Sequence, residues 1–164
     1  MDSRAPAGVA SGGADGKEPR GSESVRVHCA HCGTTNRVPA VRLADGPKCG
    51  QCKETLLPGK PLELTGATFD RHIANTDLPL VVDFWSPWCG PCRRMAPAFE
   101  QAAARVAPGV RLAKVNTETE PELAARFGIR SIPTLVAFSH GREVARQSGA
   151  VDLPRLLAWI STHF

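Results

Sequence analysis

The stretch that decides the fold is LVVDFWSPWCGPC, residues 80–92. Its first half, from Leu80 to Trp85, is an almost continuous apolar run, which is typical of a buried central strand. Its second half ends in Cys89 and Cys92, placed where that strand passes into a helix. Cysteines at this spacing lie close enough to form a disulfide, and the free N–H groups of a helix start stabilise a thiolate on the first of them. The stretch therefore predicts a redox-active dithiol.

The two cysteines are expected to have unequal roles. Cys89 faces the helix N-terminus and is predicted to be the nucleophile, whereas Cys92, one turn deeper, is better shielded and suits a resolving thiol. Asp83 interrupts the apolar strand beneath them. Burial raises the pKa of a carboxyl group, so Asp83 is a candidate proton carrier, the alternative being a strand-end charge that reaches solvent.

Four short elements, in this order along the chain, resemble the thioredoxin family. They are Val82-Asp83-Phe84-Trp85, Trp88-Cys89-Gly90-Pro91-Cys92, Ile132-Pro133-Thr134 and Gly149-Ala150. The resemblance covers about residues 59–164 and implies the thioredoxin fold, an α/β fold in which helices flank a central mixed sheet. Gly90 and Pro91 between the cysteines resemble the reducing members, which favours a reductase over an oxidase.

The resemblance also implies roles for residues outside the dithiol. Asp83 would serve Cys92 as acid and base, and Lys114 would pair with Asp83, unless this lysine simply extends to water. Pro133 would follow a cis peptide bond and face the dithiol, the alternative being an ordinary trans proline. The implied substrate-binding residues are Trp88, Gly90, Pro91, Ile132, Gly149 and Ala150.

Four further cysteines lie closer to the N-terminus. Cys29 and Cys32 form one pair, Cys49 and Cys52 a second, and sixteen residues separate the pairs, a spacing typical of a tetrahedral zinc site. Gly33 and Gly50 are expected to allow the tight turns that point N–H groups at the sulfurs. A segment with so few large apolar residues needs such a metal to fold. Two disulfides or four free thiols are the alternative.

None of the five histidines has a convincing ligand role. His28 and His31 could replace a thiolate, but four cysteines already complete the tetrahedron, so both are interpreted as solvated neighbours. His72, His140 and His163 show no ligand spacing and are likewise expected at the surface.

The chain divides into three segments. Residues 1–24 are predicted to be a disordered leader, 25–58 a zinc ribbon and 59–164 the thioredoxin domain, with the Pro- and Gly-containing linker Leu57-Pro58-Gly59-Lys60-Pro61 at the boundary. Within the last segment, the pattern predicts strands at 61–64, 80–85 and 110–116 and a hairpin over 134–148 that turns at His140-Gly141. Helices are expected around Phe69 and Ile73, from the dithiol through Val106, up to Phe127 behind a Thr119/Glu122 capping box, and around 153–160.

Charge and targeting signals narrow the function. Residues 1–58 carry eight Lys/Arg against six Asp/Glu, and residues 59–164 twelve against ten, so neither part has the basic surface of a nucleic-acid binder. No apolar run is long enough to span a membrane, and the N-terminus lacks the apolar core of a secretory signal. We therefore expect a cytoplasmic monomer that binds neither nucleic acid nor membrane.

Together these features resemble the zinc-ribbon-containing bacterial thioredoxin-2 type. The resemblance implies reduction of disulfides in client proteins by the Cys89/Cys92 dithiol and recharging by thioredoxin reductase, with structural zinc and no tightly bound organic cofactor. The alternative function is a zinc-containing redox sensor or holdase, in which oxidation of Cys29, Cys32, Cys49 and Cys52 releases the metal.

Overall fold

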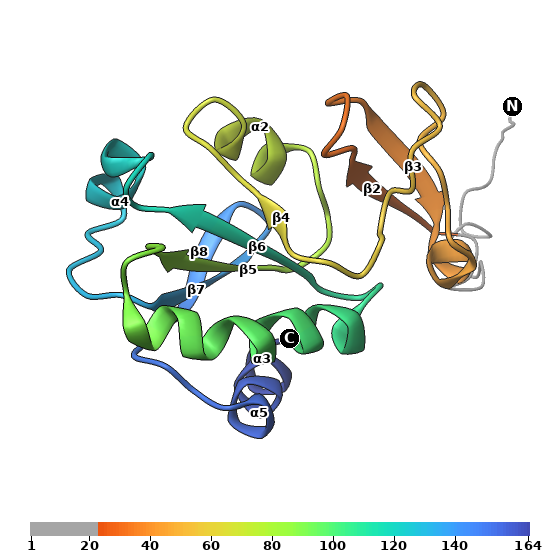
Figure 1. Cartoon of the computed structure of the whole chain (residues 1–164). Helices are drawn as coiled ribbons and strands as arrows, with labels where there is room; N and C mark the ends of the chain where they lie inside the picture. The colour runs from red at the N-terminus through yellow and green to blue at the C-terminus, as the bar shows by residue number, and fades with distance from the viewer. Residues whose placement is uncertain (1–22) are drawn as a thin grey trace, which may run out of the picture.

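The computed structural model describes residues 23–164, which form a small N-terminal ribbon packed against a larger α/β part (Figure 1). The expected disordered leader lies outside the described residues except at its end, where Ser24 already begins a strand. In the ribbon, β2 (Ser24–His28) pairs antiparallel with β3 (Thr35–Pro39), and the 3-10 helix η2 (Ala40–Asp45) follows.

The larger part is built on a five-stranded sheet in the order β4-β6-β5-β7-β8. The strands are β4 (Leu62–Glu63), β5 (Leu80–Trp85), β6 (Arg111–Asn116), β7 (Thr134–Ser139) and β8 (Arg142–Ser148). The first three in the sheet are parallel, whereas β7 and β8 run antiparallel to their neighbours. The sheet is therefore mixed, as predicted, and the apolar strand β5 is its centre.

Helices cover both faces of this sheet (Figure 1). Phe69 of α2 (Phe69–Ala74) and Leu123 of α4 (Pro121–Arg126) pack on one face. On the other face lie α3 (Gly90–Val106) and α5 (Leu153–His163), which form a core with Val81 and Leu135 of the sheet. No helix within residues 23–164 combines the length and the apolar character that crossing a membrane requires.

The alternation of side chains along β5 determines which groups face the dithiol helix. Val82 and Phe84 belong to the core under α2 and α4, whereas Val81 belongs to the core under α3. Successive side chains on a strand point to opposite faces. Asp83 therefore shares the face of Val81 and lies beneath α3.

Two local predictions fare differently. The hairpin turn at His140-Gly141 is confirmed, and both residues have positive φ, 52° and 79°, as a tight two-residue hairpin turn requires. The Thr119/Glu122 capping box is wrong. The residue before α4 is Glu120, with no capping side-chain hydrogen bond, because Pro121 occupies the first turn of α4 and moves the helix start.

The ribbon docks at the amino-terminal end of β5. Arg26 of β2 donates from its backbone N–H and its guanidinium to the Asp77 carboxylate, at 2.8–3.1 Å, and Leu78 joins the ribbon's apolar core beside Cys29 and Cys49. The dithiol follows the other end of β5, which at roughly 3.3 Å per residue is about 20 Å away. The ribbon is therefore remote from the redox site.

Candidate functional site

The dithiol lies at the start of α3. Cys89 is the N-cap residue of this helix, and the N–H of Cys92 donates to its Sγ over 3.1 Å. The two sulfurs form a disulfide, with Cα atoms 5.2 Å apart. Cys89 is half-buried and Cys92 is 2% exposed. An accessible sulfur that receives a helix N–H suits a nucleophilic thiolate, and a shielded one suits a resolving thiol.

The turn before β7 lies against the dithiol. The Ile132-Pro133 peptide bond is cis, as the resemblance implied. Sγ of Cys89 lies 3.7 Å from the carbonyl oxygen of Ile132, although 43 residues separate them. The Pro133 carbonyl in turn accepts from the N–H of Gly149, 2.9 Å away, so the Gly149-Ala150 segment adjoins the same turn.

These residues form an open surface around Cys89. Trp88 is 79% exposed, and Pro91, Gly149 and Ala150 are also exposed, while Gly90 and Ile132 are half-buried. Small side chains and an accessible backbone allow an extended peptide to approach Cys89. Trp88, Gly90 and Pro91 flank Cys89 in sequence, Ile132 contacts its sulfur, and Gly149 bonds to the same turn, so the structure brings most of the residues implied for substrate binding to one region.

Asp83 is a buried carboxyl group beneath α3. Its side chain is 1% exposed, and Oδ1 has no hydrogen-bond partner among the described residues. Burial raises the pKa of Asp83 to about 7, against an opposing effect of the nearby Lys114. A carboxyl group with a pKa near 7 can take up and return a proton at neutral pH, as a proton carrier must.

Lys114 lies beside Asp83 in the sheet but does not form the expected close ion pair. The two residues are register partners of β5 and β6. The ammonium of Lys114 lies 4.3 Å from the centre of the Trp85 ring, a cation–π contact, and no ion pair with Asp83 within 4.0 Å occurs in the described part of the chain. Lys114 therefore lowers the pKa of Asp83 only through its positive charge, without direct contact.

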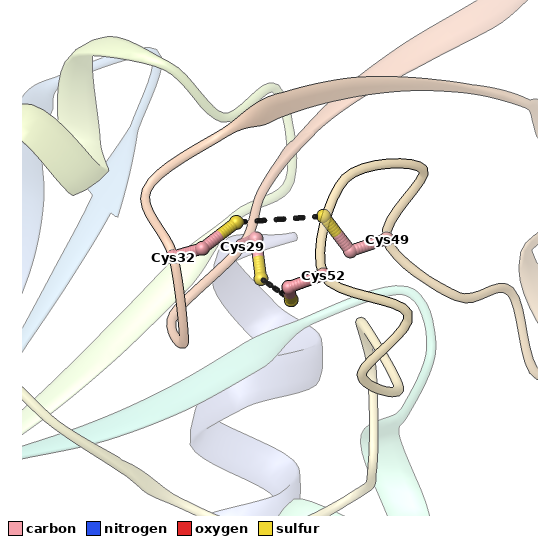
Figure 2. A group of neighbouring side chains, drawn as sticks. All are labelled: Cys29, Cys32, Cys49 and Cys52. Atoms are coloured by element: carbon pink, nitrogen blue, oxygen red, sulfur yellow. Dashed lines mark hydrogen bonds between the residues drawn. The ribbon is translucent and has the colours of Figure 1, made fainter.

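The four N-terminal cysteines converge in the ribbon, as Figure 2 shows. Their sulfurs all lie within 4.8 Å of one another, with Cys29 to Cys52 at 3.7 Å and Cys32 to Cys49 at 3.6 Å. A tetrahedral ion with Zn–S bonds of about 2.3 Å requires S···S separations of about 3.8 Å. The cluster thus fits a zinc ion and is too wide for disulfides.

Equivalent turns support the two cysteine pairs, but only one uses glycine. Gly33 has φ 83° and donates to the Cys29 carbonyl, and Lys53, not Gly50, has φ 70° and donates to the Cys49 carbonyl. The prediction for Gly50 is therefore wrong, since its N–H binds Asn36 Oδ1 instead. Asn36 also donates to Cys49 Sγ, a role without a sequence signal. Hydrogen bonds from the N–H of Cys52, then from Asn36 and Gln51, lower the pKa of Cys49 to about 6.

Two histidines contradict the surface interpretation. His28 and His72 are 3% and 0% exposed, and their Nδ1 atoms form a hydrogen bond of 3.0 Å between ribbon and α2. Burial and then Arg111 lower the pKa of His72 to about 3, so His72 is neutral at neutral pH, and burial also lowers the pKa of His28. No sequence pattern distinguishes such a contact between distant segments. His31, His140 and His163 are exposed, as predicted.

Known protein families match both parts of the chain. Residues 60–162 match the sequence model described as Thioredoxin. The chain belongs to the thioredoxin family. It is therefore a thiol-disulfide oxidoreductase that acts on protein disulfides. Residues 28–54 match the model described as Thioredoxin 2, N-terminal, which is a zinc ribbon.

Individual thioredoxins agree with this assignment. The chain is 50% identical over 134 residues to Thioredoxin C-3 of Corynebacterium nephridii, an alignment that covers 82% of this chain and 92% of that one. It is 41% identical over 101 residues to Thioredoxin 1 of a Nostoc strain, with 62% and 94% covered. For the thioredoxin of Haemophilus influenzae the values are 39% over 102 residues, with 62% and 95% covered.

Proposed function

We propose that this thioredoxin reduces disulfides of client proteins by attack from Cys89 and resolution by Cys92. The observation that carries the proposal is the asymmetry of the dithiol, in which Cys89 is accessible and receives the N–H of Cys92, while Cys92 is 2% exposed. In the reduced protein, the same N–H stabilises the Cys89 thiolate.

The reaction has two steps. The Cys89 thiolate attacks one sulfur of the client disulfide, so a mixed disulfide forms and the other client sulfur leaves as a thiolate that takes up a proton. Cys92 then loses its proton and attacks Cys89 Sγ, which forms the Cys89–Cys92 disulfide and releases the second client thiolate. Two electrons pass from the dithiol to the client, and a thioredoxin reductase returns them.

Asp83 is proposed to accept the Cys92 proton. It lies on the sheet face that α3 covers, and its pKa of about 7 allows both uptake and release at neutral pH. Because Asp83 lies beneath α3 and the client binds at the exposed side of Cys89, the proton moves from Cys92 to Asp83 on the buried side of the helix. Lys114 adjusts this pKa through its positive charge.

The client is proposed to bind as an extended segment along the cis-proline turn. The Ile132 carbonyl lies 3.7 Å from Cys89 Sγ, so a peptide next to this turn has its disulfide at the attacking sulfur. Trp88 offers an exposed apolar face at the rim, while Gly90, Pro91, Gly149 and Ala150 leave the approach free of bulky side chains.

The ribbon is proposed to hold one structural zinc ion through Cys29, Cys32, Cys49 and Cys52. The sulfur separations of 3.6 and 3.7 Å support this, as does complete ligation, which leaves no position for substrate. The proposed setting is the cytoplasm, whose reducing conditions keep these thiols available for metal.

The test uses the full chain with NADPH, thioredoxin reductase and a disulfide-bonded client protein. We expect C89S to abolish reduction and to form no client adduct, and C92S to accumulate a mixed disulfide through Cys89 that non-reducing electrophoresis detects. A stable adduct on C89S with none on C92S would reverse the assigned roles. Activity that survives C89S would remove the dithiol mechanism altogether.

A further inference from the structure

Arg111, the first residue of β6, is a buried cation for which residues 23–164 supply no carboxylate counter-ion. Arg111 is only 6% exposed, and its Nη1 atom is buried with no hydrogen-bond partner among residues 23–164. No carboxylate in this range forms an ion pair with it. A buried charge without compensation costs several kcal/mol, so something near Arg111 is expected to supply negative charge.

The ribbon is the neighbour that can supply it. Arg111 pairs in the sheet with Leu80, two residues after Leu78, which packs in the ribbon core with Cys29 and Cys49. Arg111 also lines a small pocket beside Leu57, another residue packed against that core. Burial lowers the pKa of Arg111 to about 10, which still leaves the guanidinium protonated at neutral pH.

A second arginine approaches the same pair of cysteines. The Cζ atom of Arg71 lies 3.3 Å from where a Cβ atom on Gly33 would be, so its guanidinium lies against the turn after Cys32. Arg71, Cys29 and Gly33 also line one cavity of about 120 Å³ between the ribbon and α2. Arg71 thus lies against the turn of the first cysteine pair, and Arg111 is buried beside residues that pack on the ribbon core.

We propose that Arg111 is the counter-charge of the ribbon's zinc centre, with exposed Arg71 as a weaker second. A zinc ion bound by four thiolates carries a net charge of −2, whereas the metal-free cluster, with fewer of its thiols ionised, carries less negative charge. Arg111 is therefore compensated when zinc is bound. The inference rests on the proposed zinc site and goes beyond it, because it places a positioning group for that site in the catalytic domain.

The consequence is a reciprocal coupling between the two parts. If zinc binds more tightly when the folded domain presents Arg111, then zinc stabilises the folded domain by the free energy of that difference in affinity. The tryptophans are Trp85, Trp88 and Trp159, all in the thioredoxin domain. Their fluorescence therefore follows unfolding of this domain and not of the ribbon.

The test measures zinc affinity of the full chain by competition with a coloured chelator. We expect R111M to bind zinc 10- to 100-fold more weakly than the parent, the range found when groups supporting a metal site are removed. R111K, which keeps the charge, should lose much less. R142M, an exposed arginine of β8, is the matched control and should leave the affinity unchanged.

A second measurement covers the case in which R111M does not fold. R71Q changes an exposed residue and should weaken zinc binding two- to fivefold. Zinc removal should lower the midpoint of thermal unfolding, followed by tryptophan fluorescence, by more in the parent than in R71Q. If the parent binds no zinc, the zinc proposal fails and this inference with it. If the parent binds zinc but neither arginine variant weakens binding, this inference alone is overturned.

Discussion

Replacing Asp83 by Asn should raise the stability of the oxidised protein in a strongly pH-dependent way. The pKa of Asp83 is about 7 in the folded chain, compared with an ordinary value of 3.8. Because burial raises this pKa, the native state prefers the neutral acid, and the associated stability is complete below pH 3.8 and is lost as pH rises through 7. At 1.36 kcal/mol per pKa unit, the ionised carboxylate costs about 4 kcal/mol above pH 7.

The variant does not pay this cost, since asparagine carries no charge. Measured by urea unfolding at pH 4.5 and pH 8.5, the difference in unfolding free energy between D83N and the parent should widen by about 3 kcal/mol toward the higher pH. The oxidised form is used so that Cys89 and Cys92 do not titrate. Burying the uncharged asparagine amide changes the free energy of unfolding by the same amount at both pH values, so it does not affect the comparison.

Asp70 provides the control with the opposite sign. It is exposed, and its hydrogen bonds with Arg126 lower its pKa. The ionised Asp70 therefore adds to the free energy of unfolding above its ordinary pKa, and this addition is lost on acidification. D70N should consequently not raise the free energy of unfolding at pH 8.5. A D83N stability difference that is the same at pH 4.5 and 8.5 would refute a buried, raised-pKa carboxyl group.

Three further outcomes test the mechanism and the division into parts. In stopped-flow reduction, D83N should slow resolution of the mixed disulfide at neutral pH, and a rate equal to that of the parent from pH 6 to 9 would exclude Asp83 as the proton carrier. A fragment of residues 59–164 should fold and still reduce disulfides, because the ribbon lies about 20 Å from the dithiol along β5. The fragment should be less stable than the full chain, since it lacks the Arg26–Asp77 contacts. A folded but inactive fragment would make the ribbon part of the active site. The parent should bind about one zinc ion per chain, and chelation or C49S should unfold the ribbon, which hydrogen exchange detects as lost protection of the amides in β2 and β3. Unchanged protection without metal would contradict a zinc-dependent ribbon.

The sequence alone predicted those features that depend on neighbours along the chain. The apolar run of β5 matches its strand residue for residue, and Cys89 caps the helix that the motif indicated, because both follow from local periodicity and helix-end chemistry. The cysteine spacing likewise indicated the metal cluster, since each pair sits in one short turn.

Only the tertiary structure decided the contacts between segments far apart in sequence. It places the Ile132 carbonyl next to Cys89, turns Lys114 toward Trp85, and buries His28 against His72, 44 residues away. The sequence-based interpretation of these histidines failed because a polar residue is assigned to the surface unless its partner is known. Arg111 is the same case, since a cation at a strand start is assigned to the surface, whereas the fold leaves it 6% exposed between Leu57 and the end of α3.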